Sequence, residues 1–173
     1  MTGSGYTLHQ SSSSLSSQGT SSQVINFPFQ LRRDDLLFVL IPSGEKGPRT
    51  PGWNKVTNGM KWDDPRLVSH ILSGGNYGFY PAPGSNILSI DVDDADKFHQ
   101  AGGNNLVDQT FCYSAWNNHE RYRAVVDCPD IPLKFRGHKI SIQDSGRKVI
   151  FELFLPANAE KTGGVVVGPG SCH

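Results

Sequence analysis

The sequence lacks the features that mark membrane and secreted proteins. No apolar run approaches the ~18 residues of a membrane-spanning helix, and the N-terminus has no basic segment followed by an apolar core. The 3 cysteines form no CxxC pair, and their odd number fits reduced thiols better than a disulfide framework. We therefore expect a cytoplasmic protein that does not associate with membranes.

The sequence also lacks an excess of charge of either sign. Lysine and arginine together number 16, and so do aspartate and glutamate. No overall electrostatic field therefore favours or excludes a polyanionic partner. Any contact with nucleic acid must come from a local cluster of basic side chains.

Charged side chains are absent from the first part of the chain. Residues 1–23 contain no Asp, Glu, Lys or Arg and are rich in Ser, Gln, Gly and Thr, so they cannot bury enough apolar surface to offset the entropy of ordering. We predict a disordered tail over residues 1–23 and one domain over residues 24–173. The chain ends on a loop after a predicted strand, which suggests the N-terminal part of a longer protein, truncated at its C-terminus.

Periodic patterns predict helices early in the chain and strands mainly late. Pro65 begins a run whose apolar residues repeat with helical spacing until Gly74-Gly75 ends it, and residues 95–101 form a second, short helix. Runs of β-branched and aromatic residues predict strands at 36–41, 77–80, 87–92, 122–126, 139–142, 148–154 and 164–167. This order indicates an α+β domain with a mainly antiparallel sheet and flanking helices.

Two aspartates follow one of these hydrophobic runs. Asp91 and Asp93 are separated by one residue, so both side chains project from one face of a strand. Neighbouring carboxylates repel each other unless a cation lies between them, and carboxylate oxygens are the ligands that Mg²⁺ and Mn²⁺ prefer. The pair therefore predicts a metal site. The alternative is a strand that ends in a solvated acidic turn and caps the next helix.

Glu152 is a carboxylate in a run that is otherwise apolar on both faces. Burying a lone charge costs several kcal/mol, so the residue needs a partner. It joins Asp91 and Asp93 as a third metal ligand, forms an ion pair with Arg147 or Lys148, or lies on an exposed edge of the sheet. Two acids on one strand and one on another suit two-metal nucleotidyl transfer.

Two further segments contain groups that bind phosphate. Arg121 and Arg123 alternate with an intervening tyrosine, so both guanidinium groups leave one face and could hold a triphosphate. The alternative is a surface hairpin with solvated charges. The glycine-rich turn near the C-terminus presents Ser171 and His173 for phosphate contacts, although it could also be an ordinary loop.

The motifs in their order resemble the primase-polymerase (prim-pol) branch of the archaeo-eukaryotic primase superfamily, from about residue 35 to the end of the chain. The resemblance is carried by Lys46-x-Pro48 with Gly52-Trp53, Asn76-Tyr-Gly78, Gly84 to Asp93, the turn with His119, Glu152, and Gly163 to His173. Proteins of this family serve archaeal plasmids, viruses and phages, and a helicase domain often follows the catalytic domain. The resemblance implies an RRM-like primase core.

The resemblance also implies residue roles. Asp91 and Asp93 match the motif that holds two catalytic Mg²⁺ or Mn²⁺ ions, and Glu152 takes the place of the third acid, which is usually Asp. The family's nucleotide-contacting histidine has two candidates. His119 lies at a plausible distance after the first motif, but Asn-Asn replaces the usual Gly-Gly before it, whereas His173 has the Ser-x-His spelling but follows the acid. We favour His173 and keep both.

Some relatives carry a zinc-bound stem between the first and third motifs. Cys112, His119 and Cys128 lie in that interval and could bind Zn²⁺ with a fourth ligand. Their spacing does not match a tight zinc knuckle, and cysteine is often simply buried.

These observations lead to one hypothesis and two rivals. The hypothesis is template-dependent nucleotidyl transfer on a DNA template-primer, as a primase or DNA polymerase in replication, with nucleoside triphosphates as substrates. Lys46 and Arg49 would contact template or nucleotide. The first rival is a metal-dependent nuclease that uses the same acids, and the second is a non-catalytic DNA-binding replication module.

Overall fold

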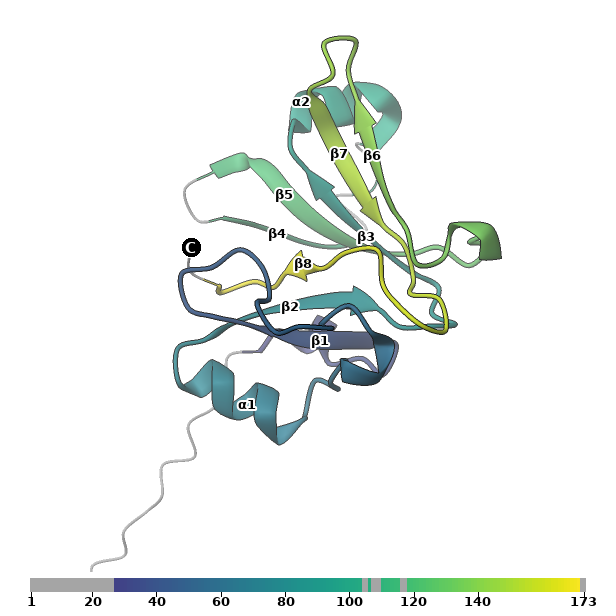
Figure 1. The fold of residues 1–173 in the computed structure, drawn as a ribbon. Coiled ribbons are helices and arrows are strands. Elements are labelled where there is room, and N and C mark those ends of the chain that lie inside the picture. The colour runs from purple at the N-terminus through teal and green to yellow at the C-terminus, as the bar shows by residue number, and fades with distance from the viewer. Residues whose placement is uncertain (1–26, 104–105, 107–109, 116–117, 172–173) are drawn as a thin grey trace, which may run out of the picture.

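The structure is a computed structural model that describes residues 27–103, 106, 110–115 and 118–171. The predicted tail over residues 1–23 lies outside the described residues. The described part has an α+β architecture with two antiparallel sheets and few helices (Figure 1). The predicted α+β class and antiparallel pairing are confirmed, but the strands divide between two sheets rather than forming one.

The smaller sheet has the strand order β1-β2-β8, and the larger has the order β4-β5-β3-β7-β6. Every pairing within them is antiparallel. The strands are β1 (Leu36–Ile41), β2 (Asn76–Pro81), β3 (Ile87–Val92), β4 (Phe111–Ala115), β5 (Asn118–Asp127), β6 (Lys139–Gln143), β7 (Val149–Phe154) and β8 (Val166–Val167).

Helix α1 (Pro65–Leu72) lies against the outer side of the smaller sheet (Figure 1). The side chain of Asp64 accepts a hydrogen bond from the backbone N–H of Arg66 and caps the helix, and Pro65 occupies its first position. Leu67 is fully buried. The helix begins and ends where the sequence predicts.

Helix α2 (Ala95–Phe98) follows β3 and is shorter than predicted. Asp94 caps it by accepting a hydrogen bond from the backbone N–H of Lys97. After Phe98 the chain continues as a π-helical turn over His99–Gly103, in which Gly102 has a non-helical φ of 97°. None of the helices within the described ranges is long and apolar enough to cross a membrane.

The two faces of the larger sheet have different roles. On β3, Ile90 and Val92 point toward α2 and pack with Phe98, whereas Ile87 points toward the smaller sheet and is fully buried among its aromatic side chains. Asp91 lies on the same face as Ile87, four residues along the strand. One face therefore forms the core between the sheets near Ile87 and carries charge near Asp91.

Candidate active site

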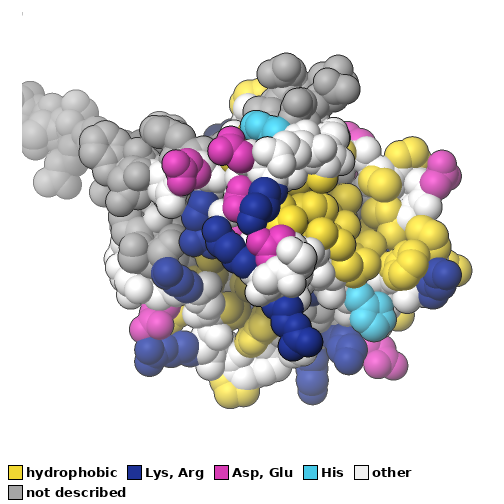
Figure 2. Space-filling view, turned by 90° about the horizontal axis from the view of Figure 1, so that it is seen from above, with side chains coloured by type: hydrophobic (Ala, Val, Ile, Leu, Met, Phe, Trp, Pro, Cys, Tyr) yellow, Lys and Arg dark blue, Asp and Glu magenta, His cyan; other side chains and the backbone are white. Residues whose placement is uncertain are grey.

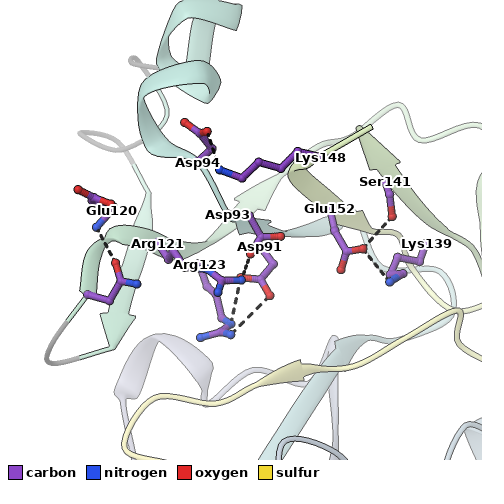
Figure 3. A network of polar contacts seen from close by, with 11 residues as sticks. Asp91, Asp93, Asp94, Glu120, Arg121, Arg123, Lys139, Ser141, Lys148 and Glu152 are labelled. Carbon is purple, nitrogen blue, oxygen red and sulfur yellow. Dashed lines mark hydrogen bonds and ion pairs between the residues drawn. The ribbon is translucent and has the colours of Figure 1, made fainter. Parts of the chain in front are cut away.

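Asp91 lies at the centre of the larger sheet, between the two strands that carry the other predicted residues. On β5, Arg123 is its direct partner, and on β7, Glu152 is its direct partner. Opposite residues of antiparallel strands project from the same face, with Cβ atoms about 5 Å apart. The structure thus brings Asp91, Arg123 and Glu152 together on one face, as Figure 3 shows.

Each aspartate of the pair contacts one of the two predicted arginines (Figure 3). The guanidinium Nε of Arg123 lies 3.4 Å from Oδ1 of Asp91, and its Nη2 lies 3.5 Å from Oδ2. Arg121 forms an ion pair with Asp93. The two arginines therefore share one face, as predicted. The cations beside these carboxylates are guanidinium groups.

Glu152 forms an ion pair, but with neither of the predicted partners. Nζ of Lys139 donates to Oε1 of Glu152 at 2.8 Å, and the hydroxyl of Ser141 donates to the same oxygen at 2.7 Å. Lys148 instead lies 3.5 Å from Asp94. The register of β6 against β7 explains both contacts. Ser141 is directly opposite Glu152, and Lys139 lies two residues before Ser141 on the same face of β6.

The pKa values of the two neighbouring acids move in opposite directions. Burial raises the pKa of Asp91 above its ordinary value, and the opposing effects of Arg123 and Arg121 do not cancel this rise. Burial also acts to raise the pKa of Glu152, but the hydrogen bonds from Lys139 and Ser141 outweigh it, so its pKa lies below the ordinary value. Asp91 is therefore the carboxylate whose burial outweighs the effect of its basic neighbours.

A cleft of about 1100 Å³ opens over this face of the larger sheet. The larger sheet contributes Asp91, Glu152, Arg121, Arg123 and Lys139, the loop after β1 contributes Lys46 and Trp53, and the segment after β8 contributes Gly170 and Ser171. Four basic and two acidic side chains therefore line the cleft. Residues from five separate parts of the sequence meet there: the loop after β1, strand β3, strand β5, the β6–β7 hairpin and the segment after β8.

Two tyrosines hold the glycine-rich turn at the cleft. The hydroxyl of Tyr113 donates to the carbonyl oxygen of Val167 at 2.8 Å, and that of Tyr77 donates to the carbonyl oxygen of Pro169 at 3.1 Å. A Cβ atom on Gly168 would lie 2.1 Å from the Tyr77 ring, so only glycine fits against it. Burial raises the pKa of both tyrosines, which keeps their hydroxyl groups protonated as donors.

Other predicted residues lie outside the cleft or outside the described residues. Arg49 pairs with Glu45 and is not among the residues that line the cleft. Asp93 does not line the cleft either, but its partner Arg121 does. His119 is part of β5, although its side chain is not described, and His173 lies outside the described residues.

The predicted zinc ligands lie on or directly after the neighbouring strands β4 and β5. Cys112 on β4 is half-buried and packs against the apolar cluster around Phe98, and burial raises the pKa of its thiol. Cys128 follows directly after β5 and is half-buried as well. The structure gives Cys112 a packing role.

The acids have the right chemistry for a divalent cation but are turned away from a common centre. Among the described residues, no group of three His, Cys, Asp or Glu side chains is arranged to hold one metal ion. Figure 3 shows the reason, because each carboxylate points toward its own basic partner. Carboxylate oxygens are the ligands that Mg²⁺ and Mn²⁺ prefer. The donor chemistry fits a hard cation, although each of the three carboxylates is paired with a basic side chain in the structure.

The sequence did not reveal Lys139, Ser141 and Trp53 as residues of the site. Lys139 and Ser141 alternate with apolar residues on a predicted strand, which places them on one face. The turn at Asp144-Ser-Gly146 indicates a hairpin with the strand of Glu152, and that signal could have paired them. Trp53 occurs only as part of a loose motif in a loop.

Comparison of the sequence with protein-family models finds no match, and comparison with curated proteins finds no significant relative. The assignment of a function therefore depends on the residues of the cleft and on their geometry.

Proposed function

We propose that this chain is a nucleotidyltransferase that extends a nucleic-acid strand on a DNA template, as a primase or a DNA polymerase of the prim-pol kind. The chemistry is in-line attack of a 3′-hydroxyl on the α-phosphate of a nucleoside triphosphate. A DNA template-primer and nucleoside triphosphates are its substrates, and a helicase domain or protein is its partner in replication.

One observation carries this proposal: the cleft joins acids for a cation with bases for a polyphosphate. Asp91 and Glu152 are direct neighbours across two strands, and Arg121, Arg123 and Lys139 lie around them. A nuclease needs the acids to hold a metal ion, whereas three basic side chains beside them suit the binding of a polyphosphate. A purely structural acid pair would not need an open cleft of this volume.

The residues of the cleft take separate roles in the proposed reaction. When bound, two Mg²⁺ or Mn²⁺ ions would activate the attacking hydroxyl and neutralise the phosphates. Asp91, Asp93 and Glu152 would hold these ions. Arg121 and Arg123 would bind the triphosphate through paired N–H donors, whose fork geometry matches phosphate oxygens.

The glycine-rich turn and the loop after β1 complete the proposed pocket. Gly170 has a φ of 81°, and the backbone there, with the hydroxyl of Ser171, can approach an anion closely. Lys46 lines the same cleft and would contact the template or the nucleotide. The histidine that contacts the nucleotide is His119 or His173.

The topology of the larger sheet supports an RRM-like primase core. Strand β5 lies between β3 and β4, and α2 lies between β3 and β4 in the chain, as in a split βαβ unit. Between β5 and β7 the chain forms the 3₁₀ turn Leu133–Phe135 and strand β6 in place of a second helix. Asp91, Arg121, Arg123 and Glu152 lie on the three middle strands of this sheet, and Lys139 lies on the edge strand β6.

The experiment that tests this proposal uses a primer labelled at its 5′ end and annealed to a longer DNA template. The protein is incubated with Mg²⁺ or Mn²⁺, with and without deoxynucleotides or ribonucleotides. Longer products that depend on added nucleotide support nucleotidyl transfer. Shortened products would identify a nuclease, and binding without any change in length would identify a non-catalytic module.

A further inference from the structure

Positive charge is concentrated in three segments of this chain, although the chain as a whole is neutral. Residues 46–62, 131–143 and 161–171 contain no Asp or Glu. Half of the 16 Lys and Arg residues lie in these segments: Lys46, Arg49, Lys55, Lys61, Lys134, Arg136, Lys139 and Lys161. A neutral protein attracts a polyanion only through a local cluster of this kind.

The structure brings the three segments together beside the cleft. The backbone N–H of Thr162 donates to the carbonyl oxygen of Asn54 at 3.0 Å, which joins the first segment to the third. A Cβ atom on Gly163 would lie 2.4 Å from the carbonyl carbon of His138, so the second segment packs closely against the third. Seen from above, Lys and Arg side chains gather along the lower edge of the molecule (Figure 2). The cluster is therefore a surface of the fold and not only a feature of the sequence.

Two lysines of this surface lie directly opposite each other. Lys55 and Lys161 are paired in an isolated antiparallel bridge, so their side chains project from one face with Cβ atoms about 5 Å apart. Both residues are exposed, and neither forms an ion pair with a residue that the structure describes. Glu160, which precedes Lys161, is exposed as well and forms an ion pair with neither lysine. Water solvates the two ammonium groups, but an anion that lies between them is attracted by both.

An aromatic ring lies where this surface meets the cleft. Trp53 is half-buried, packs against the apolar cluster of Leu37, Val39 and Tyr80, and lines the cleft together with Lys139. The apolar cluster holds one side of the indole in place, and the cleft gives a flat base access to the other side. Aromatic rings stack on unpaired bases, whereas the bases of a duplex are already stacked on each other.

We infer that Lys55, Lys161 and Trp53 form a binding site for a single-stranded nucleic acid outside the proposed reaction centre. The two lysines contact backbone phosphates, and Trp53 stacks on a base where the strand enters the cleft. The inference rests on the proposed function for the identity of this strand, which is then the unpaired part of the template. The binding itself is independent of the three acids of the cleft and of any metal ion.

The salt dependence of binding tests the two lysines. Fluorescence anisotropy of a labelled single-stranded oligothymidine gives its Kd for the whole chain in the absence of divalent metal. The Kd is measured between about 50 and 200 mM salt, because each phosphate contact to a single strand contributes about 0.7 to the slope of log K against log salt concentration. The slope of Lys55→Gln/Lys161→Gln should therefore be shallower than that of the wild type by about 1.4.

A second double variant with the same change of net charge is the control. Arg66→Gln/Arg147→Gln removes one exposed cation from α1 and one from the turn between β6 and β7, and neither residue lines the cleft. Its slope should equal that of the wild type. Trp53→Leu keeps an apolar side chain on the core and should weaken binding at least about 5-fold, whereas Trp53→Phe keeps a ring and should stay within about 2-fold of the wild type.

The outcomes separate this inference from the proposed function. Equal slopes for the wild type and Lys55→Gln/Lys161→Gln, or equal reductions in both double variants, would overturn the inference, and so would wild-type affinity of Trp53→Leu. Binding to phosphatidylserine vesicles in place of oligothymidine would assign the surface to a membrane and overturn it as well. The expected slopes in a protein that fails to extend a primer would overturn only the proposed function.

Discussion

Replacing Asp91 and Glu152 by their amides should change stability by different amounts, although the two carboxylates are direct neighbours across the sheet. In Glu152→Gln the amide can still accept the hydrogen bonds of Lys139 and Ser141, but the attraction to the ammonium group is lost. The side chain of Lys139 is 39% exposed, so solvent screens part of that attraction. We expect a loss of about 1 kcal/mol in the free energy of unfolding.

In Asp91→Asn the gain and the loss nearly cancel. The substitution removes the cost of burying a carboxylate, which raises the pKa of Asp91, and also removes a contact with Arg123 at 3.4 Å. We expect a change of less than about 0.5 kcal/mol. Urea denaturation at neutral pH measures both free energies of unfolding. In thermal unfolding, Glu152→Gln should melt about 2–4 °C below Asp91→Asn.

The pH dependence gives a second check on the same pair. Because the pKa of Glu152 lies below its ordinary value of 4.5, its stabilisation is fully present above pH 4.5 and is lost as the pH falls through the lowered pKa. The difference between wild type and Glu152→Gln should therefore shrink in acid. For Asp91, whose pKa is raised, the cost of the ionised form disappears as the pH falls through that pKa. Equal destabilisation of both variants, or a gap that persists in acid, would refute the reasoning.

Two further predictions concern the frame of the cleft and the histidine. Gly163→Ala should destabilise the protein by about 1–3 kcal/mol, because its Cβ would lie 2.4 Å from the backbone of His138, whereas Gly47→Ala, which has open space around it, should be neutral in the same denaturation experiment. In a chain extended past residue 173, steady-state nucleotide incorporation should show a raised KM and a lowered turnover for His173→Ala and little change for His119→Ala; the reverse pattern would assign the nucleotide contact to His119.

Much of the fold could be predicted because its signals are local. The start of α1 at Pro65, its end before Gly74 and the hydrophobic strand Ile87–Val92 are each written in a few consecutive residues. Strand β4 (Phe111–Ala115) was not predicted, since its short run of apolar and polar residues has no clear strand pattern. The segment forms a strand by pairing with β5. Tertiary pairing also divided the strands into two sheets, and no local pattern reports that.

The candidate site shows the same division between local and tertiary signals. Alternation along one strand placed Arg121 beside Arg123, and it placed Asp91 on their face once β3 and β5 paired. The partner of Glu152 depended on the register of β6 against β7, so Lys139 was missed, and Lys148, one of the partners considered, contacts Asp94 instead. Arg49 was placed with the site because of its neighbourhood in sequence, but the chain turns it toward Glu45.

Primer extension by the variants Asp91→Asn, Asp93→Asn and Asp94→Asn tests the central claim most directly. Asp91 and Asp93 lie in ion pairs with the two arginines, whereas Asp94 caps α2 and contacts lysines, and Asn caps a helix as well as Asp does. With Mn²⁺, template and nucleotides, the wild type and Asp94→Asn should extend a primer. Folded Asp91→Asn and Asp93→Asn should be slower by at least about 100-fold. Extension by all four proteins at the same rate, or by none of them, would contradict nucleotidyl transfer at this cleft.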